Sequence, residues 1–168
     1  MRIYLPATST LLRTLGDTGR IGPAPLTAFA VTPGLREWYV DDEAEELEYA
    51  ASMEAARASL RLLDGDPSAA RRRVVVSLDA PEASVTIRDD LDRGVVSLDT
   101  EVSRAQIAAF HIDDAEAERT VAAAAGVIDR ADIGDEDAQQ AVDDAEGFEL
   151  SWYDPSELEL LLVDVGGE

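Results

Sequence analysis

The chain has 168 residues and a formal net charge of −22, from 36 acidic and 14 basic side chains. This length suits one domain. All 14 basic side chains are arginine, and the sequence contains no lysine, cysteine or asparagine. Schiff-base and P-loop chemistry, thiol catalysis, disulfides and cysteine-ligated zinc are therefore excluded. His111 is the only histidine, so we expect neither a multi-histidine metal site nor a cofactor.

Charge and hydropathy also bear on location and partners. The N-terminus has no cationic segment followed by an apolar run, and no uncharged stretch of about 18 residues could span a bilayer. We therefore expect a cytoplasmic protein. The acidic surface repels phosphate backbones and anionic lipids, so we expect no nucleic-acid and no membrane partner. The alternative is that the acidity imitates DNA, as in an acidic DNA-mimic type inhibitor.

The first part of the chain alternates short strands and helices. Arg2–Leu5 predicts a strand, and Ser9–Leu15 predicts a helix with Thr8 at its N-cap. Leu26–Val31 is a short apolar run bounded by prolines, which predicts a second strand. Thr32, followed by a proline, is typical of a helix start.

A long helical region is predicted from Pro33 to about Leu63, with a break near Asp41 because Asp42 and Glu45 form a capping-box pattern. The second helix has two opposed apolar stripes; one holds Leu47, Ala51, Ala55, Ala58 and Leu62, and the other holds Tyr49, Met53, Ala56, Leu60 and Leu63. Glu48, Ser52 and Ser59 form a narrow polar edge between them. Either the rest of the domain or a second copy in a homodimer must cover both stripes.

The middle of the chain is rich in strand signals. Arg71–Asp79 is rich in β-branched residues, and Ser84–Arg88 and Gly94–Leu98 form a candidate hairpin. Ile107–Ile112 is interpreted as a strand, although its alanines leave a helix open.

The last third predicts three helices and one strand. Asp113 with Glu116 forms a second capping box, opening a helix that ends near Gly126 or Arg130. The remaining elements are a helix at Asp135–Glu146, a strand at Phe148–Trp152 and a final helix beginning at the Asp154 cap. Together these patterns predict a single α+β domain over residues 1–165, with a mixed sheet of about six or seven short strands, helices packed on it and a frayed tail at 166–168.

His111 and Asp113 are the weak candidates for catalysis. In an extended strand, residues two apart share a face, and a histidine–carboxylate pair can act as a general base. The alternative is that Asp113 and Asp114 cap the following helix and His111 fills a strand end.

Arg36 and Trp38 are the weak candidates for ligand binding, because a guanidinium beside a large aromatic ring can hold a carboxylate or stack on a ligand. Core packing is the alternative for this segment. Paired carboxylates are too abundant in this sequence to indicate a site.

Two segments resemble a known family. Pro25–Pro33 with the following LREWY and EELEYAA stretches, and the AFHIDDA stretch around His111, look like an uncharacterised actinobacterial family, a domain of unknown function. The resemblance implies a single domain and carries no activity.

The sequence contains few residue types that commonly act in catalysis, and its long helix has two apolar stripes that must be covered. Both features favour a non-enzymatic module that acts through protein contacts or self-association. The rival is a small enzyme or ligand-binding domain that uses His111 and nearby carboxylates. A pocket at His111 separates the two hypotheses.

Overall fold

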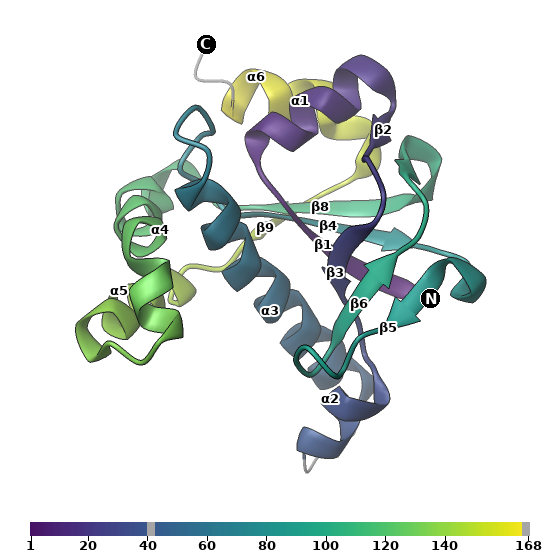
Figure 1. Cartoon of the computed structure of the whole chain (residues 1–168). Helices are drawn as coiled ribbons and strands as arrows, with labels where there is room; N and C mark the ends of the chain where they lie inside the picture. Colours follow the sequence, from purple (N-terminus) through teal and green to yellow (C-terminus); the bar gives the residue numbers. More distant parts are fainter. Residues whose placement is uncertain (40–42, 166–168) are drawn as a thin grey trace.

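A computed structural model describes residues 1–39 and 43–165 of the chain (Figure 1). The predicted cap at Asp42, the predicted break at Asp41 and the predicted tail at 166–168 lie outside the described residues. Seven strands form the main sheet in the order β5-β6-β3-β1-β4-β8-β9. Their bounds are Arg2–Ala7 (β1), Leu26–Phe29 (β3), Val74–Asp79 (β4), Val85–Ile87 (β5), Val95–Leu98 (β6), Ile107–Ile112 (β8) and Ser151–Tyr153 (β9). A separate pair joins β2 (Arg20–Ile21) and β7 (Val102–Ser103).

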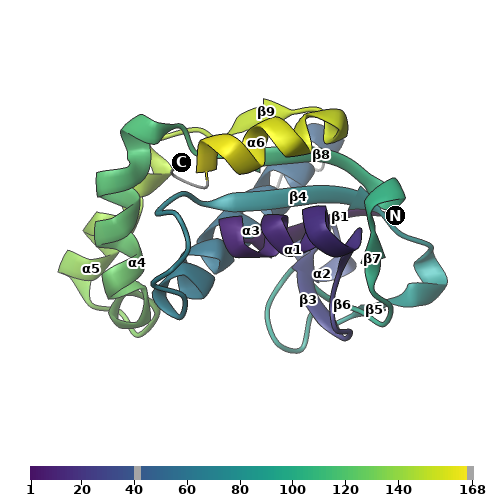
Figure 2. The same cartoon turned by 90° about the horizontal axis from the view of Figure 1, so that it is seen from above.

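Helices cover both faces of this sheet. The α-helices are α1 (Ser9–Thr18), α2 (Pro33–Trp38), α3 (Ala44–Asp64), α4 (Glu118–Asp132), α5 (Glu136–Glu146) and α6 (Leu158–Val165). Short 3₁₀ turns lie at Glu82–Ser84, Arg104–Gln106, Ala115–Ala117 and Pro155–Glu157. Figures 1 and 2 show α4 and α5 as a pair on the side of the molecule away from β5.

Strand alternation sorts the core into two layers. In β1, Ile3 and Leu5 point into the cluster that includes residues of α1 and α6, whereas Tyr4 points to the cluster under α3. Ala51 and Ala55 lie in this second cluster, so small side chains let α3 approach the sheet closely. The C-terminal part of α3 packs through Leu60 and Leu63 on α4 and α5.

The predicted α+β fold class and the number of strands are confirmed, but the sheet is antiparallel in every recorded pairing rather than mixed. The reason lies in the position of β1. Both β3 and β4 run antiparallel to β1, so they are parallel to each other and are joined by the α3 crossover. Because β1 lies between them, this parallel relationship never becomes a hydrogen-bonded pair.

The other elements follow their predicted signals with two exceptions. Ile107–Ile112 is a strand, and Thr8, Thr32 and Asp154 accept the expected cap hydrogen bonds from backbone N–H groups. The prediction that Asp113 caps the next helix is wrong, because its carboxylate is buried against Arg73. That helix, predicted to end near Gly126 or Arg130, ends at Asp132, close to the second of these positions. The strand predicted at Phe148–Trp152 begins only at Ser151.

Most of the two apolar stripes of α3 are covered within the chain. Leu47, Ala51 and Ala55 of the first stripe and Ala56, Leu60 and Leu63 of the second are buried. Tyr49 and Leu62 stay exposed. Arg57 and Arg61 of α3 both form ion pairs with Asp132 of α4. The apolar positions of the two stripes that stay uncovered are therefore Tyr49 in the N-terminal half of α3 and Leu62 in its last turn.

Candidate functional site

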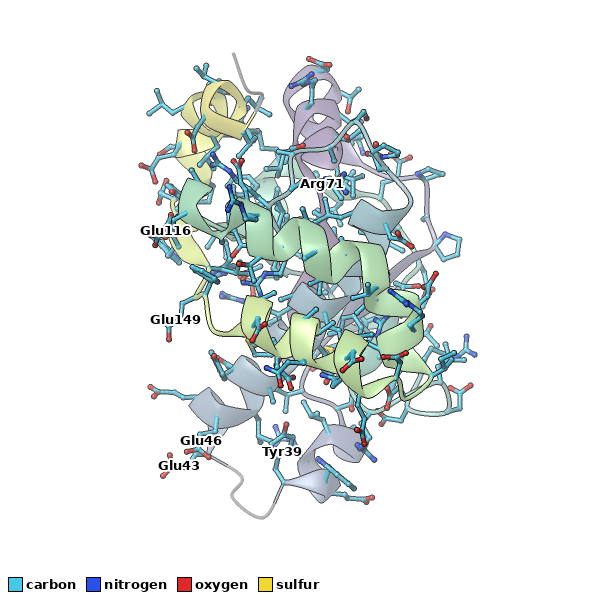
Figure 3. All side chains as sticks on the ribbon, turned by 90° about the vertical axis from the view of Figure 1, so that its left-hand side faces the viewer. Tyr39, Glu43, Glu46, Arg71, Glu116 and Glu149 are labelled. Atoms are coloured by element: carbon cyan, nitrogen blue, oxygen red, sulfur yellow. The ribbon has the colours of Figure 1, made fainter. Side chains whose placement is uncertain are left out.

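A cavity of about 370 Å³ lies between the N-terminal half of α3 and the sheet. Its lining comes from α3 (Glu45, Glu48, Tyr49, Ser52 and Met53), from β1, β4 and β8 with the residue preceding β4 (Tyr4, Arg73, Val75 and His111), and from the segment between α5 and β9 (Phe148, Glu149 and Leu150). In Figure 3, Glu149 lies between the α4–α5 pair and the start of α3, where Glu46 is labelled. Five segments that are far apart in the sequence therefore border one space.

A second hollow of about 490 Å³ shares Glu45, Tyr49 and Met53 with this cavity. Apart from Tyr39, its lining residues all belong to α3. It is therefore a depression along one helix, whereas the first cavity has the sheet as its floor. His111, Tyr4 and Arg73 line the first cavity and not the second hollow.

His111 reaches the cavity because of the alternation along β8. Its neighbours Phe110 and Ile112 are buried in the α1–α6 layer, so the imidazole points to the opposite, α3 side. His111 Nε2 lies 2.6 Å from the hydroxyl oxygen of Ser77 on β4. Which of the two groups donates depends on the tautomer of the ring.

Burial lowers the pKa of the His111 imidazole, and the nearby positive charge of Arg2 lowers this pKa further. The ring is therefore neutral at pH 7. A neutral imidazole has one donor and one acceptor nitrogen. Since Nε2 is engaged with Ser77, Nδ1 is the nitrogen left for a ligand; in the described part of the chain it has no hydrogen-bond partner.

Asp113, the predicted partner of His111, instead binds Arg73. The Arg73 guanidinium donates to the two carboxylate oxygens at 2.8 Å each, and both side chains are fully buried. Arg73 Nη2 also donates to the carbonyl oxygen of Phe148 at 2.8 Å. Arg73 is thus part of the cavity wall. Together with Asp113 it connects β4 and β8 to the segment before β9.

Tyr4 on β1 forms the part of the floor nearest to Glu48. Burial of its hydroxyl, together with the negative charge of Glu48, raises the pKa of Tyr4 to about 12. The phenol therefore keeps its proton at neutral pH. It offers an aromatic face and a hydroxyl donor to anything that enters.

The charges around the cavity do not balance. The two arginines closest to it are neutralised by their own partners, Arg73 by Asp113 and Arg2 by Asp79 at 2.9 Å. The lining carboxylates of Glu45, Glu48 and Glu149 form no ion pair with any residue that the structure describes. The mouth therefore carries an excess of negative charge.

The arrangement suits binding better than nucleophilic catalysis. Ser77 is only 2% exposed, lies in the middle of β4 and does not line the cavity. Within residues 1–39 and 43–165, no carboxylate is hydrogen-bonded to His111, so the orienting third member of a catalytic triad is missing. The Ser77 hydroxyl instead fixes the orientation of the His111 ring.

Arg36 and Trp38, the predicted ligand-binding pair, lie in the last turn of α2. Neither of them lines the cavity or the second hollow. Trp38 is 61% exposed, so the core-packing alternative is wrong for this side chain. Its ring is stacked instead by Arg93, whose guanidinium carbon lies 3.6 Å from the ring centroid.

Sequence reasoning missed Tyr4, Ser77 and Glu48 as neighbours of His111. A signal for Glu48 was present in the polar edge of α3, since Glu48 and Ser52 of that edge line the cavity. Its third member, Ser59, is buried and binds backbone groups of β1 and β4. Ser77 is a lone hydroxyl within an apolar strand, which is a weak signal on its own.

The part of the chain that the structure describes holds neither a metal-binding cluster nor a membrane-spanning helix. No three histidine, aspartate or glutamate side chains are grouped there so that they could hold a metal ion. None of its helices combines the length and the apolar character needed to cross a bilayer.

The fold and the cavity thus define an α+β domain with a ligand-sized space between its long helix and its sheet. The chain belongs to a family of unknown function, DUF6912, whose model matches residues 1–162. The resemblance seen in the sequence to a family without an assigned activity is thereby confirmed, while the actinobacterial origin stays a prediction. No curated protein and no solved structure matches the chain.

Proposed function

We propose that this protein is a small-molecule-binding domain and that the cavity between α3 and the sheet is its binding site. The observation that carries the proposal is the position of His111, the only histidine, in the floor of a space of about 370 Å³. Ligand sites in proteins usually measure about 300–1,000 Å³ and combine apolar walls with a few polar groups.

The walls of the cavity fit this description. Val75, Met53 and Leu150 are apolar, while Tyr4 and His111 supply polar groups at fixed positions. The His111 ring is held by Ser77, and the wall behind it is fixed by the Arg73–Asp113 pair. Groups held in this way lose little conformational freedom on binding, which favours affinity.

The test uses the single histidine as a reporter. In ¹H NMR spectra, His111 gives one imidazole Hε1 resonance, which is followed while a panel of small amines, alcohols, carboxylates and neutral aromatics is added at millimolar concentration. We expect at least one compound to shift this resonance in a saturable way. If no compound in the panel does so, the proposal is wrong.

Ser52→Phe and Thr14→Phe form a matched pair of variants for this test. Ser52 lines the cavity from α3, so the phenyl ring of Ser52→Phe fills the space and abolishes the shift. Thr14 is exposed on α1, beyond the opposite face of the sheet, so Thr14→Phe leaves the shift unchanged. Equal binding by both variants would place the ligand elsewhere.

A second candidate, the module acting through self-association, is supported by the exposure of Tyr49 and Leu62, one from each stripe of α3. Light scattering over a concentration series tests it. A particle that stays monomeric at high micromolar concentration contradicts self-association and leaves the ligand-binding proposal untouched.

A further inference from the structure

The charge of the cavity narrows the chemical class of its ligand. Glu45 and Glu48 are exposed on successive turns of α3, and Glu149 faces them from the segment before β9. Each of the three lines the cavity, and none is paired with an arginine in the described residues. The chain has no lysine that could neutralise these carboxylates.

The positive groups near the cavity do not offset this charge. Among the described residues that line the cavity, Arg73 is the only cation, and Asp113 neutralises it through two hydrogen bonds of 2.8 Å to the guanidinium. Arg2, which acts on His111 and Tyr4, is neutralised by Asp79. An anionic ligand would therefore meet a net negative field, and a cation would be attracted.

The walls below the carboxylates are aromatic and apolar. Tyr4, Tyr49 and Phe148 present rings to the space, and Val75 and Leu150 complete an apolar floor. The face of an aromatic ring attracts ammonium groups as well as hydrocarbon. His111 adds a neutral imidazole rather than a second positive charge.

We infer that the cavity takes an organic monocation, an amine whose ammonium group lies between Glu45 and Glu48 while its apolar body lies on Tyr4, Tyr49 and Phe148. This inference rests on the proposed function and specifies the ligand class of the same site. It goes beyond an acidic surface in general, because it requires the charge and the apolar cavity to act on one molecule.

Three probes with the same phenyl body and different head groups test the inference: 2-phenylethylamine, 2-phenylethanol and 3-phenylpropionate. Dissociation constants are measured by titrating the His111 Hε1 resonance and, independently, by calorimetry. We expect the amine to bind about tenfold more tightly than the alcohol, and the carboxylate to bind most weakly.

Matched charge variants separate a local effect from the overall charge of −22. The double variant Glu45→Gln/Glu48→Gln should lose about tenfold in affinity for the amine and nothing for the alcohol. Glu116→Gln/Glu136→Gln removes the same charge from exposed positions that do not line the cavity, and it should bind the amine like the unchanged chain.

Three outcomes distinguish failure of the inference from failure of the proposed function. If the alcohol or the carboxylate shifts His111 as strongly as the amine, the cavity binds ligands but the inference of a cation is overturned. If both double variants weaken the amine equally, its affinity comes from the overall charge, and the inference again fails. If none of the three probes and no compound of the wider panel shifts His111, the proposed function itself fails.

Discussion

Asp113 accepts three hydrogen bonds from one residue, Arg73: from its backbone N–H, from Nε and from Nη2, each at 2.8 Å. The pair lies where β4 begins and β8 has just ended. The ion pair orients the Arg73 guanidinium so that Nη2 also donates a hydrogen bond to the carbonyl oxygen of Phe148. The position of Phe148 in the cavity wall therefore depends on this pair.

Removing one member of the pair should be costly. Arg73→Met leaves the Asp113 carboxylate buried without its cation, so we expect the free energy of unfolding to fall by about 3–5 kcal/mol in urea titrations. The double variant Arg73→Met/Asp113→Leu removes both charges and should recover much of this loss. A double variant no more stable than the single one would contradict the assignment of the loss to an unpaired charge.

A smaller loss is expected at Ser59 of α3. Its buried hydroxyl donates to the Ala7 carbonyl at 2.8 Å and accepts from the Val74 N–H at 3.1 Å. Ser59→Ala leaves these backbone groups without this partner, so we expect a loss of about 1–3 kcal/mol. Ser84 is half-buried and its hydroxyl donates only to the Pro81 carbonyl at the surface, so Ser84→Ala serves as the control and should change stability by less than about 0.5 kcal/mol. Similar losses in both variants would count against the bridging role.

The titration of His111 is expected below the ordinary histidine pKa of about 6.5, because burial and Arg2 both disfavour the imidazolium. The unfolded chain then holds more protons than the folded one as the pH falls below about 6.5. The contribution of neutral His111 to stability is therefore complete above this pH and is lost as the pH falls through the folded pKa. A pH titration of the Hε1 resonance measures the pKa directly.

His111→Gln isolates this contribution from the titration of the many carboxylates. Between about pH 7 and pH 5.5, the unchanged chain should lose more stability than the variant, by about 1.4 kcal/mol for each unit of lowered pKa. A midpoint at or above 6.5, or equal pH dependence in both chains, contradicts the expectation.

Arg36 and Trp38 should contribute nothing to ligand binding in the cavity. Because neither lines it, Arg36→Ala and Trp38→Ala should leave the dissociation constant of 2-phenylethylamine unchanged within a factor of about two. Trp38→Ala also removes the stack with Arg93, which costs about 0.5–1 kcal/mol at an exposed position. A clear loss of affinity would mean that the ligand reaches α2.

Local signals carried most of the element predictions. Thr8, Thr32 and Asp154 form cap hydrogen bonds as their sequence contexts indicate, because a cap depends on residues within one turn. The cap predicted at Asp113 was wrong for the converse reason. Arg73, which lies 40 positions away in the sequence, binds that carboxylate instead. Because both side chains are buried, the ion pair is favoured over a cap hydrogen bond.

The site could be predicted only in part. His111 was singled out because it is the only imidazole, and it does line the cavity. Its partner Ser77 could not be found, since a diagonal contact between β4 and β8 depends on strand pairing and register, which a single sequence does not reveal. The same holds for Tyr4, which comes close only because β1 lies at the centre of the sheet.

The two ends of helix α3 have different surroundings. Its last turns, with Leu60 and Leu63, are buried against α4 and α5, whereas its first turns, with Tyr49 and Ser52, border the cavity. In these first turns Leu47 and Ala51 are buried in the core, so only changes at exposed positions such as Tyr49 should cost the fold little. If the proposed function holds, the exposed positions in this half of the helix are where substitutions could alter the choice of ligand while the domain keeps its stability.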